Sequence, residues 1–500
     1  MRHEAAELPL AADRADTSPL TSQVAGQIRD AIGDGRLAAG ERLPSTRALA
    51  AVLSVSRTVV TGAYAQLFAE GWIEGRHGSG TYVSAGAPGA TSLDRGPGAS
   101  EPDGAQVPGV PGTGDGLGRA GFWPNGGLGE DAAALDAELS EDLPQASGDV
   151  ADLRPGIPWV PGIDRAAWRR AWRSVGLTSP LGRADPAGLP ELRGALTGYL
   201  RRSRGFRCTP DQVLLTRGVT AALSLLTAGL LGPGDVVGVE EPGYPRARDV
   251  LSAHGAQVVP CRVDAHGLVV EDLPPGLRLV YTTPAHQYPL GGRLPVPRRQ
   301  ALIEWARRNG TVIVEDDYDG EFRYDVAPLP PMYGLGPDVV VYLGTTSKTL
   351  TPALRLGWLV AEPGLVTRLA KDSYVSEAGP SELVQHAVLT LVKTGDLERH
   401  VRRMRHEYCR RRAVLVTALR ACGGGVLLGD EAGMHVVYQT SRGAEALAAD
   451  AWQRGVALFT LRRYFAGTAT CEGLVLGYGA AGLADVTRAC QVLAEVLRDP

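Results

Sequence analysis

The chain has 500 residues, a formal net charge of −4 and an apolar fraction of 44%. This length exceeds what one hydrophobic core usually serves, so roughly two to four domains are expected. The sequence has no apolar run of about 18 residues, so no membrane span is predicted. The first twenty residues lack the pattern of a signal peptide. The six cysteines are scattered without a CxxC pair, which is typical of a reduced compartment and predicts a cytoplasmic protein. The slightly acidic balance restricts any nucleic-acid contact to a local patch.

One segment divides the chain. Between residues 85 and 150, 22 of 66 residues are Gly or Pro, against a combined base rate of about 12%, and the segment has no hydrophobic period. We predict a flexible linker over 85–150. It separates a small N-terminal domain at 17–84 from a large domain at 151–500.

The small domain has the pattern of three helices followed by a hairpin. The first helix is predicted from four apolar residues spaced four apart, Leu20, Val24, Ile28 and Ile32. Ser45 is expected to cap a short second helix, and Ser56 a third that ends at Gly71. The expected buried face of the third helix is Val60, Ala63, Tyr64 and Leu67. The segments WIE and GTYV flank a glycine-rich turn and predict a two-stranded wing.

This pattern predicts a winged helix-turn-helix, in which the third helix can enter the major groove of DNA. Ser56, Arg57, Thr58 and Thr61 stand near the start of that helix, where they can reach base edges or phosphates. Arg47, at the start of the second helix, is placed for a backbone phosphate. Residues 20–84 hold six arginines and five acidic residues. The charge alone therefore leaves a DNA-binding domain and a protein-docking module as alternatives.

Three strings between Pro19 and Val83 favour the first alternative: LPSTRALA, VSRTVVTGAYAQLFAEGW and HGSGTYV. They closely resemble the GntR-type winged helix. The resemblance implies binding of double-stranded DNA through Arg47, Ser56, Arg57, Thr58 and Thr61, with Gly78 at the wing tip. Gly62 lies within the recognition helix, where glycine costs roughly 1 kcal/mol relative to alanine. Either a close approach to DNA or sequence drift would account for it.

The large domain alternates strand-like and helical segments. The strand-like runs are VLLT (213–216), DVVGVE (235–240), LRLVY (277–281), TVIVED (311–316) and DVVVYLG (338–344). Helical periods near 219–231, 245–254 and 297–308 lie between them. This alternation predicts an α/β domain with a mostly parallel, doubly wound sheet and a site at the strand ends.

The string YLGTTSKTLTPALRLGW contains one of only three lysines, Lys348, with Arg355 seven residues later. Such a lysine can form a Schiff base with an aldehyde, while neighbouring hydroxyls and an arginine hold a phosphate. Upstream, VIVEDDYDGEF places Asp316 and Tyr318 at a strand end. A carboxylate there can keep a pyridine nitrogen protonated, and a tyrosine can donate to a phenolic oxygen. The other acidic residues of that string, Glu315, Asp317 and Asp319, are expected to be solvated loop or helix-cap residues.

From about Asp152 to Leu497 the chain resembles fold-type I aminotransferases, through LRPGIPWVPGIDRAAWRRAW, DPAGLPELRGALTGYLRRSRG, LLTRGVTAALSLL, EEPGYPRAR and TPAHQYPLGG. Together with the GntR-type head it resembles a MocR-type regulator. The resemblance implies pyridoxal 5′-phosphate (PLP) as cofactor, with Lys348 as Schiff-base lysine, Asp316 at the pyridine nitrogen, Tyr318 at the phenolic oxygen and Tyr244 over the ring. It assigns the PLP phosphate to Val219, Thr220, Thr345, Ser347 and Arg355, and an effector carboxylate to Arg463.

Two positions depart from the aminotransferase pattern. Tyr288 stands where working aminotransferases usually have an asparagine, which favours a regulator with little or no turnover. Arg183 stands where the family has a tyrosine that reaches the neighbouring subunit's phosphate. No metal site is predicted, because His400, His406 and Cys409 do not share one face of their predicted helix.

We therefore expect a PLP-dependent DNA-binding transcription regulator that senses a small amino compound or PLP itself. The resemblance also implies a head-to-tail homodimer. The alternatives are a working PLP-dependent aminotransferase with an accessory domain, and a repressor whose PLP fold has only a structural role. The winged helix argues against the first alternative, and the intact Lys348–Arg355 pair argues against the second.

Overall fold

The computed structural model describes residues 10, 12–13, 19–76, 80–84, 150–179, 182–324, 330–429 and 431–498. The predicted linker over 85–150 thus lies outside the described residues except for Val150, and Gly78 lies outside them as well. Among the helices that the structure describes, none is both long and apolar enough to cross a membrane.

The N-terminal head has the predicted order of three helices and a hairpin. Its elements are α1 (Leu20–Gly33), α2 (Thr46–Val52), α3 (Arg57–Glu70), β1 (Ile73–Arg76) and β2 (Gly80–Val83). The two strands are antiparallel. Both predicted caps are present, since the hydroxyl of Ser45 accepts from the backbone N–H of Ala48 and that of Ser56 accepts from Val59. Gly71 ends α3 with a φ of 79°, a left-handed conformation that favours glycine.

The core of the head lies between α1 and α3. The four predicted core residues of α3, Val60, Ala63, Tyr64 and Leu67, are all buried. The Tyr64 hydroxyl donates to the carbonyl oxygen of Pro44 at 2.7 Å. A Cβ added to Gly62 would lie 3.1 Å from Cγ2 of Thr21 on α1. Close packing of α3 against α1 within the head therefore favours a small residue at this position.

The large domain is built on a mixed sheet of eight strands in the order β4-β11-β10-β9-β8-β5-β6-β7. The strands are β4 (Val213–Thr216), β5 (Val236–Glu241), β6 (Gln257–Asp264), β7 (Gly267–Leu268), β8 (Leu279–Thr282), β9 (Val312–Asp316), β10 (Val340–Thr345) and β11 (Gly357–Val360). The inner strands β10, β9, β8, β5 and β6 run parallel, while β11 is antiparallel to both neighbours. The prediction of a mostly parallel sheet is confirmed.

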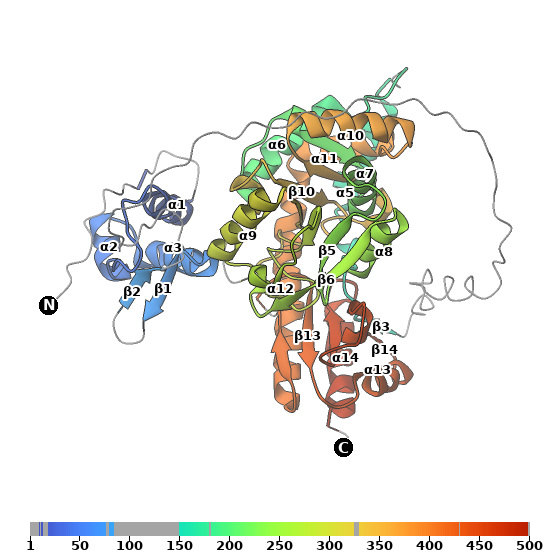
Figure 1. Ribbon diagram of the computed structural model, residues 1–500. Helices are drawn as coiled ribbons and strands as arrows, with labels where there is room; N and C mark the ends of the chain where they lie inside the picture. The colour runs from blue at the N-terminus through green and yellow to red at the C-terminus, as the bar shows by residue number, and fades with distance from the viewer. Residues whose placement is uncertain are drawn as a thin grey trace. The chain divides into compact units, whose positions relative to one another are not determined.

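Helices cover both faces of this sheet (Figure 1). They are α5 (Arg165–Gly176), α6 (Pro190–Arg204), α7 (Val219–Leu230), α8 (Pro245–Ala253), α9 (Val296–Asn309), α10 (Pro363–Val375) and α11 (Glu382–Lys393). On β9, Ile313 packs in one core with α5, α6, α9 and α11, and Val314 packs in another with α7, α8 and α10. Burial on both faces explains why these strands read as continuous apolar runs.

A C-terminal subdomain follows the long helix α12 (Asp396–Cys422). Its antiparallel sheet has the order β12-β13-β16-β15. The elements are β12 (Val426–Leu428), β13 (His435–Gln439), α13 (Ala444–Gln453), β15 (Phe459–Thr460), β16 (Gly473–Gly477) and α14 (Leu483–Val496). A short parallel pair, β3 (Ala151–Asp152) with β14 (Val456–Ala457), ties the start of the large domain to this subdomain.

A buried ion network joins the end of α6 to the segment after β9. The guanidinium of Arg204 donates to Asp317 and, at 2.7 Å, to Glu321, and all three side chains are at most 5% exposed. The hydroxyl of Tyr342 donates to Asp317 at 2.7 Å, and that of Tyr199 donates to Glu321 at 2.8 Å. Each buried carboxylate thus has a cation and a hydroxyl as partners, as buried charges require.

We expect Arg204→Ala to lower the free energy of unfolding by about 3–5 kcal/mol, because it leaves two buried carboxylates without their counter-charge. Urea denaturation of the full chain measures this. Arg202→Ala is the matched control, since Arg202 is half exposed and pairs with Glu398 at the surface. Its expected cost is at most about 1 kcal/mol. Equal costs for the two variants would contradict the stabilising role of the buried network.

Candidate functional site

The parallel strands bring four polar side chains to one edge of the sheet. Glu240 lies near the end of β5, Thr282 ends β8, Asp316 ends β9 and Thr345 ends β10. Neighbouring strands are in register here, with Thr282 opposite Glu315 and Leu343 opposite Asp316. Ligand sites of open α/β sheets form at such carboxyl edges.

Asp316 is buried and has one oxygen engaged. The Tyr281 hydroxyl donates to its Oδ2, whereas Oδ1 has no hydrogen-bond partner among the described residues. Burial raises the pKa of Asp316 to about 7. An acceptor oxygen without a partner in the core is unusual. This one suits a ligand that carries a protonated ring nitrogen.

Lys348 follows β10 and is covered by the segment that precedes α5. Its Nζ donates to the carbonyl oxygen of Gly156 at 2.6 Å. Gly156 has a φ of +85°, and a Cβ added there would lie 3.0 Å from the Lys348 Nζ. Glycine therefore allows the chain to pass directly over the amine, which has the chemistry to attack an aldehyde.

The N-terminus of α7 meets the strand ends next to this lysine. Gly357, which pairs with Thr345, would place a Cβ 2.9 Å from the Cα of Gly218, the residue before α7. The first helical residues, Val219 and Thr220, and the hydroxyl of Thr345 are therefore brought together. The backbone N–H of Ser347 donates to Thr345 Oγ1 at 3.0 Å. Free N–H groups of a helix start together with hydroxyls make an anion-binding corner.

Three of the predicted arginine sites lie at the surface. Arg355 is exposed, with a φ of +46°, two residues before Gly357. Arg463 is exposed and its guanidinium lies 4.6 Å from the centroid of the Phe459 ring. Arg183 is also exposed and lies 5.7 Å from the Tyr374 ring.

Aromatic rings gather around Tyr288, the residue that departs from the aminotransferase pattern. Its ring centroid lies 5.9 Å from that of Tyr244, 5.5 Å from Tyr318 and 5.2 Å from Tyr464. Its hydroxyl lies 3.2 Å from the hydroxyl of Tyr464. Tyr288 thus links the predicted ring-covering tyrosine, Tyr244, to the predicted hydroxyl donor, Tyr318.

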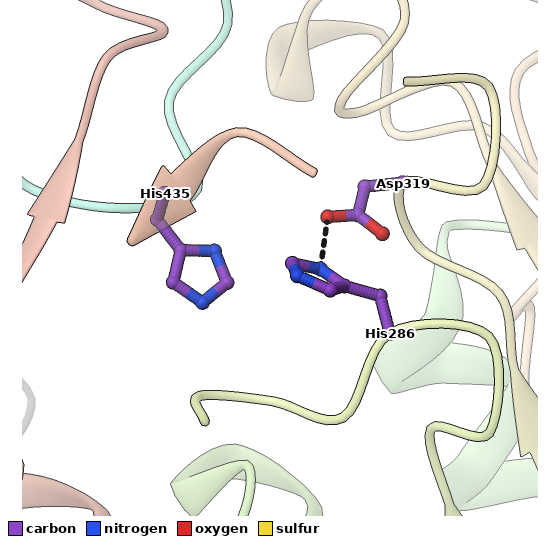
Figure 2. A group of neighbouring side chains, drawn as sticks. All are labelled: His286, Asp319 and His435. Atoms are coloured by element: carbon purple, nitrogen blue, oxygen red, sulfur yellow. Dashed lines mark hydrogen bonds and ion pairs between the residues drawn. The ribbon is translucent and has the colours of Figure 1, made fainter. Parts of the chain in front are cut away.

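The hydroxyl of Tyr318 leads to a polar cluster that the sequence analysis missed. It lies 2.9 Å from Nδ1 of His286, and that nitrogen lies 3.0 Å from Oδ2 of Asp319. His435, at the start of β13, completes the cluster, which Figure 2 shows. Burial lowers the pKa of His435 to about 3, so its ring is neutral. His286 and Asp319 each follow the end of a neighbouring parallel strand, a signal that could have paired them from the sequence.

Three acidic residues were predicted wrongly as solvated loop or cap residues. Glu315, Asp317 and Asp319 are all at most 5% exposed. Glu315 accepts the backbone N–H groups of Met332 at 2.9 Å and Tyr333 at 3.0 Å. Burial raises the pKa of Glu315 to about 7. The carboxyl end of β9 is therefore a buried acidic segment in which each side chain has its own partner.

The residues predicted to contact DNA lie together on the head. Those that the structure describes are all exposed: Arg47, Ser56, Arg57, Thr58 and Thr61. The Nε of Arg57 lies 3.4 Å from Oγ1 of Thr46, which joins the start of α3 to the start of α2. One continuous surface therefore carries both helix starts.

Comparison with known proteins agrees with both halves of this description. Residues 20–83 match the gntR family of bacterial regulatory proteins, and residues 168–469 match aminotransferase class I and II. The chain is 35% identical to a probable rhizopine catabolism regulatory protein, MocR, of Rhizobium meliloti, over 94% of this chain and 92% of that protein. It is 31% identical to an HTH-type pyridoxine biosynthesis transcriptional regulator, PdxR, of Corynebacterium glutamicum, over 95% of each chain.

Among solved structures, the large domain resembles a kynurenine aminotransferase of Pyrococcus horikoshii, in a complex with PMP. The TM-score is 0.66 at 26% identity, and the match covers 74% of this chain and 94% of that one. A gntR-family DNA-binding head joined to a fold-type I aminotransferase body defines a class of transcription regulator. Since its similarity to MocR and PdxR spans nearly the full length, the chain belongs to the MocR-type regulators.

The raised pKa of Asp316 predicts how the stability of the cofactor-free protein depends on pH. An unfolded aspartate loses its proton near pH 4, whereas the native state keeps it to about pH 7. The native state thus binds more protons in this window, and its stability falls as pH rises through it. Asp316→Asn carries no such proton, so its free energy of unfolding relative to the wild type should increase from pH 4 to pH 7.

Urea denaturation at a series of pH values measures this difference. Glu315 remains in both proteins, so its own contribution cancels. Asp211→Asn, at an exposed position, is the control and should run parallel to the wild type. A constant difference between Asp316→Asn and the wild type across the window would contradict the buried, protonated Asp316.

Proposed function

We propose that this chain is a PLP-dependent transcription regulator whose aminotransferase-type domain senses a small amino compound or PLP. The observation that carries the proposal is that Lys348 and the open Oδ1 of Asp316 lie at the ends of neighbouring strands, in a chain that also has a DNA-binding head. An aldehyde, a ring nitrogen and a phosphate would need Lys348, Asp316 and Thr345. Asp316 ends β9, Thr345 ends the neighbouring strand β10, and Lys348 follows β10. A domain with only a structural role would have no need of this combination.

The site residues fit PLP by their chemistry. When bound, PLP supplies an aldehyde that captures amines and a ring that withdraws electrons. Lys348 would hold the aldehyde carbon, and Asp316 would accept the ring N–H through Oδ1. Tyr318 would donate to the phenolic oxygen and Tyr244 would cover the ring face. The phosphate would be bound by Val219, Thr220, Thr345, Ser347 and Arg355.

The effector is proposed to be a small compound with an amine, because Lys348 is poised for amine exchange. Arg463 is proposed to bind its carboxylate, if it carries one. We infer little or no turnover of amino acids, because Tyr288 replaces the usual asparagine and its hydroxyl faces Tyr464. Rapid multiple turnover with an ordinary amino acid and keto-acid pair would favour a working aminotransferase instead.

Regulation requires that the effector bind two arrangements of the protein with different affinity. We propose a head-to-tail homodimer with a head at 17–84, a flexible linker at 85–150 and an effector domain at 151–500. Two heads would then read two half-sites. A flexible 66-residue linker has a root-mean-square span of roughly 40–50 Å. This span allows half-sites one helical turn of DNA or more apart.

The cofactor assignment predicts where PLP attaches. After borohydride reduction of the PLP-loaded protein, peptide mapping should place the label on Lys348. The chain's other lysines, Lys371 and Lys393, are internal controls. Lys348→Ala should abolish both the label and any effect of PLP or amines on DNA binding in a mobility-shift assay with the chain's own promoter region. Label on either other lysine would refute the assignment.

The DNA-binding surface predicts two different mutational effects. Arg57 can reach a guanine edge, so Arg57→Ala should relax sequence choice at one base pair and cost roughly 1–3 kcal/mol there. Arg47 is expected to hold a phosphate. Arg47→Ala should therefore weaken binding to all sequences alike and lower the salt slope by about one. Binding titrations with specific and mismatched DNA at several salt concentrations measure both.

The full chain is compared with the two variants under the same conditions. An unchanged selectivity in Arg57→Ala would show that the third helix does not read the base at that position. A loss of selectivity in Arg47→Ala would reverse the roles of the two arginines.

A further inference from the structure

The cluster of His286, Asp319 and His435 brings three metal-ligating groups together inside the large domain. Their ligating atoms lie within 4.8 Å of one another, and all three side chains are buried. In a tetrahedral zinc site with bonds of 2.0–2.1 Å, ligand atoms are about 3.3 Å apart. The limit of 4.8 Å covers one atom each of His286, His435 and Asp319, so the side chains would have to move closer together around one ion.

Hydrogen bonds set the tautomer of each imidazole. Nε2 of His435 lies 2.8 Å from the carbonyl oxygen of Pro289 and donates its proton there, so Nδ1 carries the lone pair. Nδ1 of His286 lies 3.0 Å from Asp319 Oδ2. With the proton on that nitrogen, the lone pair of His286 is on Nε2. A metal-binding histidine typically has its second nitrogen bound to a carbonyl or a carboxylate in this way.

The lone pair on Nε2 of His286 accepts no hydrogen bond from the described part of the chain. The atom is buried, and the side chain is only 3% exposed. Figure 2 shows a ring nitrogen of His435 turned toward His286 and Asp319. This nitrogen is Nδ1, because Nε2 is bound to Pro289. With these tautomers, two imidazole lone pairs lie near one another without a proton between them.

Two glycines, Gly433 and Gly291, allow the backbone to pass close to His286. A Cβ added to Gly433 would lie 2.2 Å from Cε1 of His286, and one added to Gly291 would lie 3.1 Å from its Nε2. Gly433 has a φ of +78° and Gly291 a φ of +78°. Any other residue at position 433 would clash with the imidazole ring, so glycine is needed there for the ring to take its place beside Asp319.

From this geometry we propose that His286 and His435 bind a first-row divalent transition-metal ion of the Zn²⁺ type, with Asp319 orienting His286. Imidazole nitrogens favour Zn²⁺, Ni²⁺, Co²⁺ or Cu²⁺, whereas Mg²⁺ and Ca²⁺ favour oxygen ligands. The remaining coordination positions are open to water or to an oxygen or nitrogen of a bound small molecule. The prediction of no metal site rested on the spacing of His400, His406 and Cys409 alone, and the residues of this cluster come from three other segments.

The proposed ion lies beside the tyrosine that meets the cofactor in the proposed function, but its binding does not depend on PLP. Nδ1 of His286 is 2.9 Å from the Tyr318 hydroxyl. An ion on Nε2 would hold the Nδ1 proton in place between Asp319 and Tyr318. Metal binding and PLP binding can therefore be tested separately on the same protein.

The experiment is equilibrium dialysis of tag-free full chain, freed of metal with EDTA, against Zn²⁺ in competition with a chromophoric chelator. The wild type should bind one Zn²⁺ per chain and should not retain Mg²⁺. His286→Asn and His435→Asn should each lose this binding. Asp319→Asn should keep it with an affinity about 10–100-fold lower, as expected for an orienting partner. Replacement by Co²⁺ gives a visible absorption band that reports nitrogen ligation directly.

Two further variants separate the possible results. His254→Asn removes an exposed histidine and should bind like the wild type. Lys348→Ala should also bind Zn²⁺ normally, which distinguishes this site from metal held by the lysine or by bound PLP. Circular dichroism verifies that the variants are folded. No stoichiometric Zn²⁺ on the wild type, or equal binding by His286→Asn, His435→Asn and the wild type, would overturn the proposal.

Discussion

The burial of carboxylates at the carboxyl edge of the sheet is the constraint on which the site depends. Removing a carboxylate from water is costly unless hydrogen bonds or counter-charges replace the lost hydration. Glu315 is matched by the backbone N–H groups of Met332 and Tyr333. Asp317 is matched by Arg204, and Asp319 by His286. These partners fix the chain after β9, so that the acidic segment works as a rigid support for the atoms that face a ligand.

Against this background the unmatched atoms are informative. Oδ1 of Asp316 and Nε2 of His286 are buried acceptors without partners in the described chain. Oδ1 of Asp317 is also without a partner, but the other oxygen of that carboxylate is bound by Arg204 and Tyr342. Unsatisfied buried groups in native proteins call for a functional explanation. Tyr318 follows Asp316 by two residues and its hydroxyl lies 2.9 Å from Nδ1 of His286, so the proposed cofactor site and the proposed ion site are adjacent.

The sequence predicted what depends on local patterns. The caps Ser45 and Ser56 and the buried face of α3 follow from neighbouring residues, and the five strands from their continuous apolar runs. The buried state of Asp317 could not be read in the same way. A run of closely spaced acidic residues is typical of a solvated loop, and the partner of Asp317, Arg204, comes from the end of α6. His435 was out of reach for a related reason, since it belongs to the C-terminal sheet, which was not predicted.

The proton of Tyr318 connects these observations. A tyrosine hydroxyl has one proton to donate, and that of Tyr318 lies within hydrogen-bond distance of both Nδ1 and the carbonyl oxygen of His286. Because Nδ1 of His286 donates its own proton to Asp319, the Tyr318 proton goes to the carbonyl oxygen of His286, and a ligand oxygen that accepts it takes it from there. A change of ligand at Tyr318 is thereby registered by a side chain that lies between the large sheet and the C-terminal sheet. Regulation by a bound effector requires a differential interaction with two arrangements of the domain, and the Tyr318 hydroxyl is a group through which a ligand would make one.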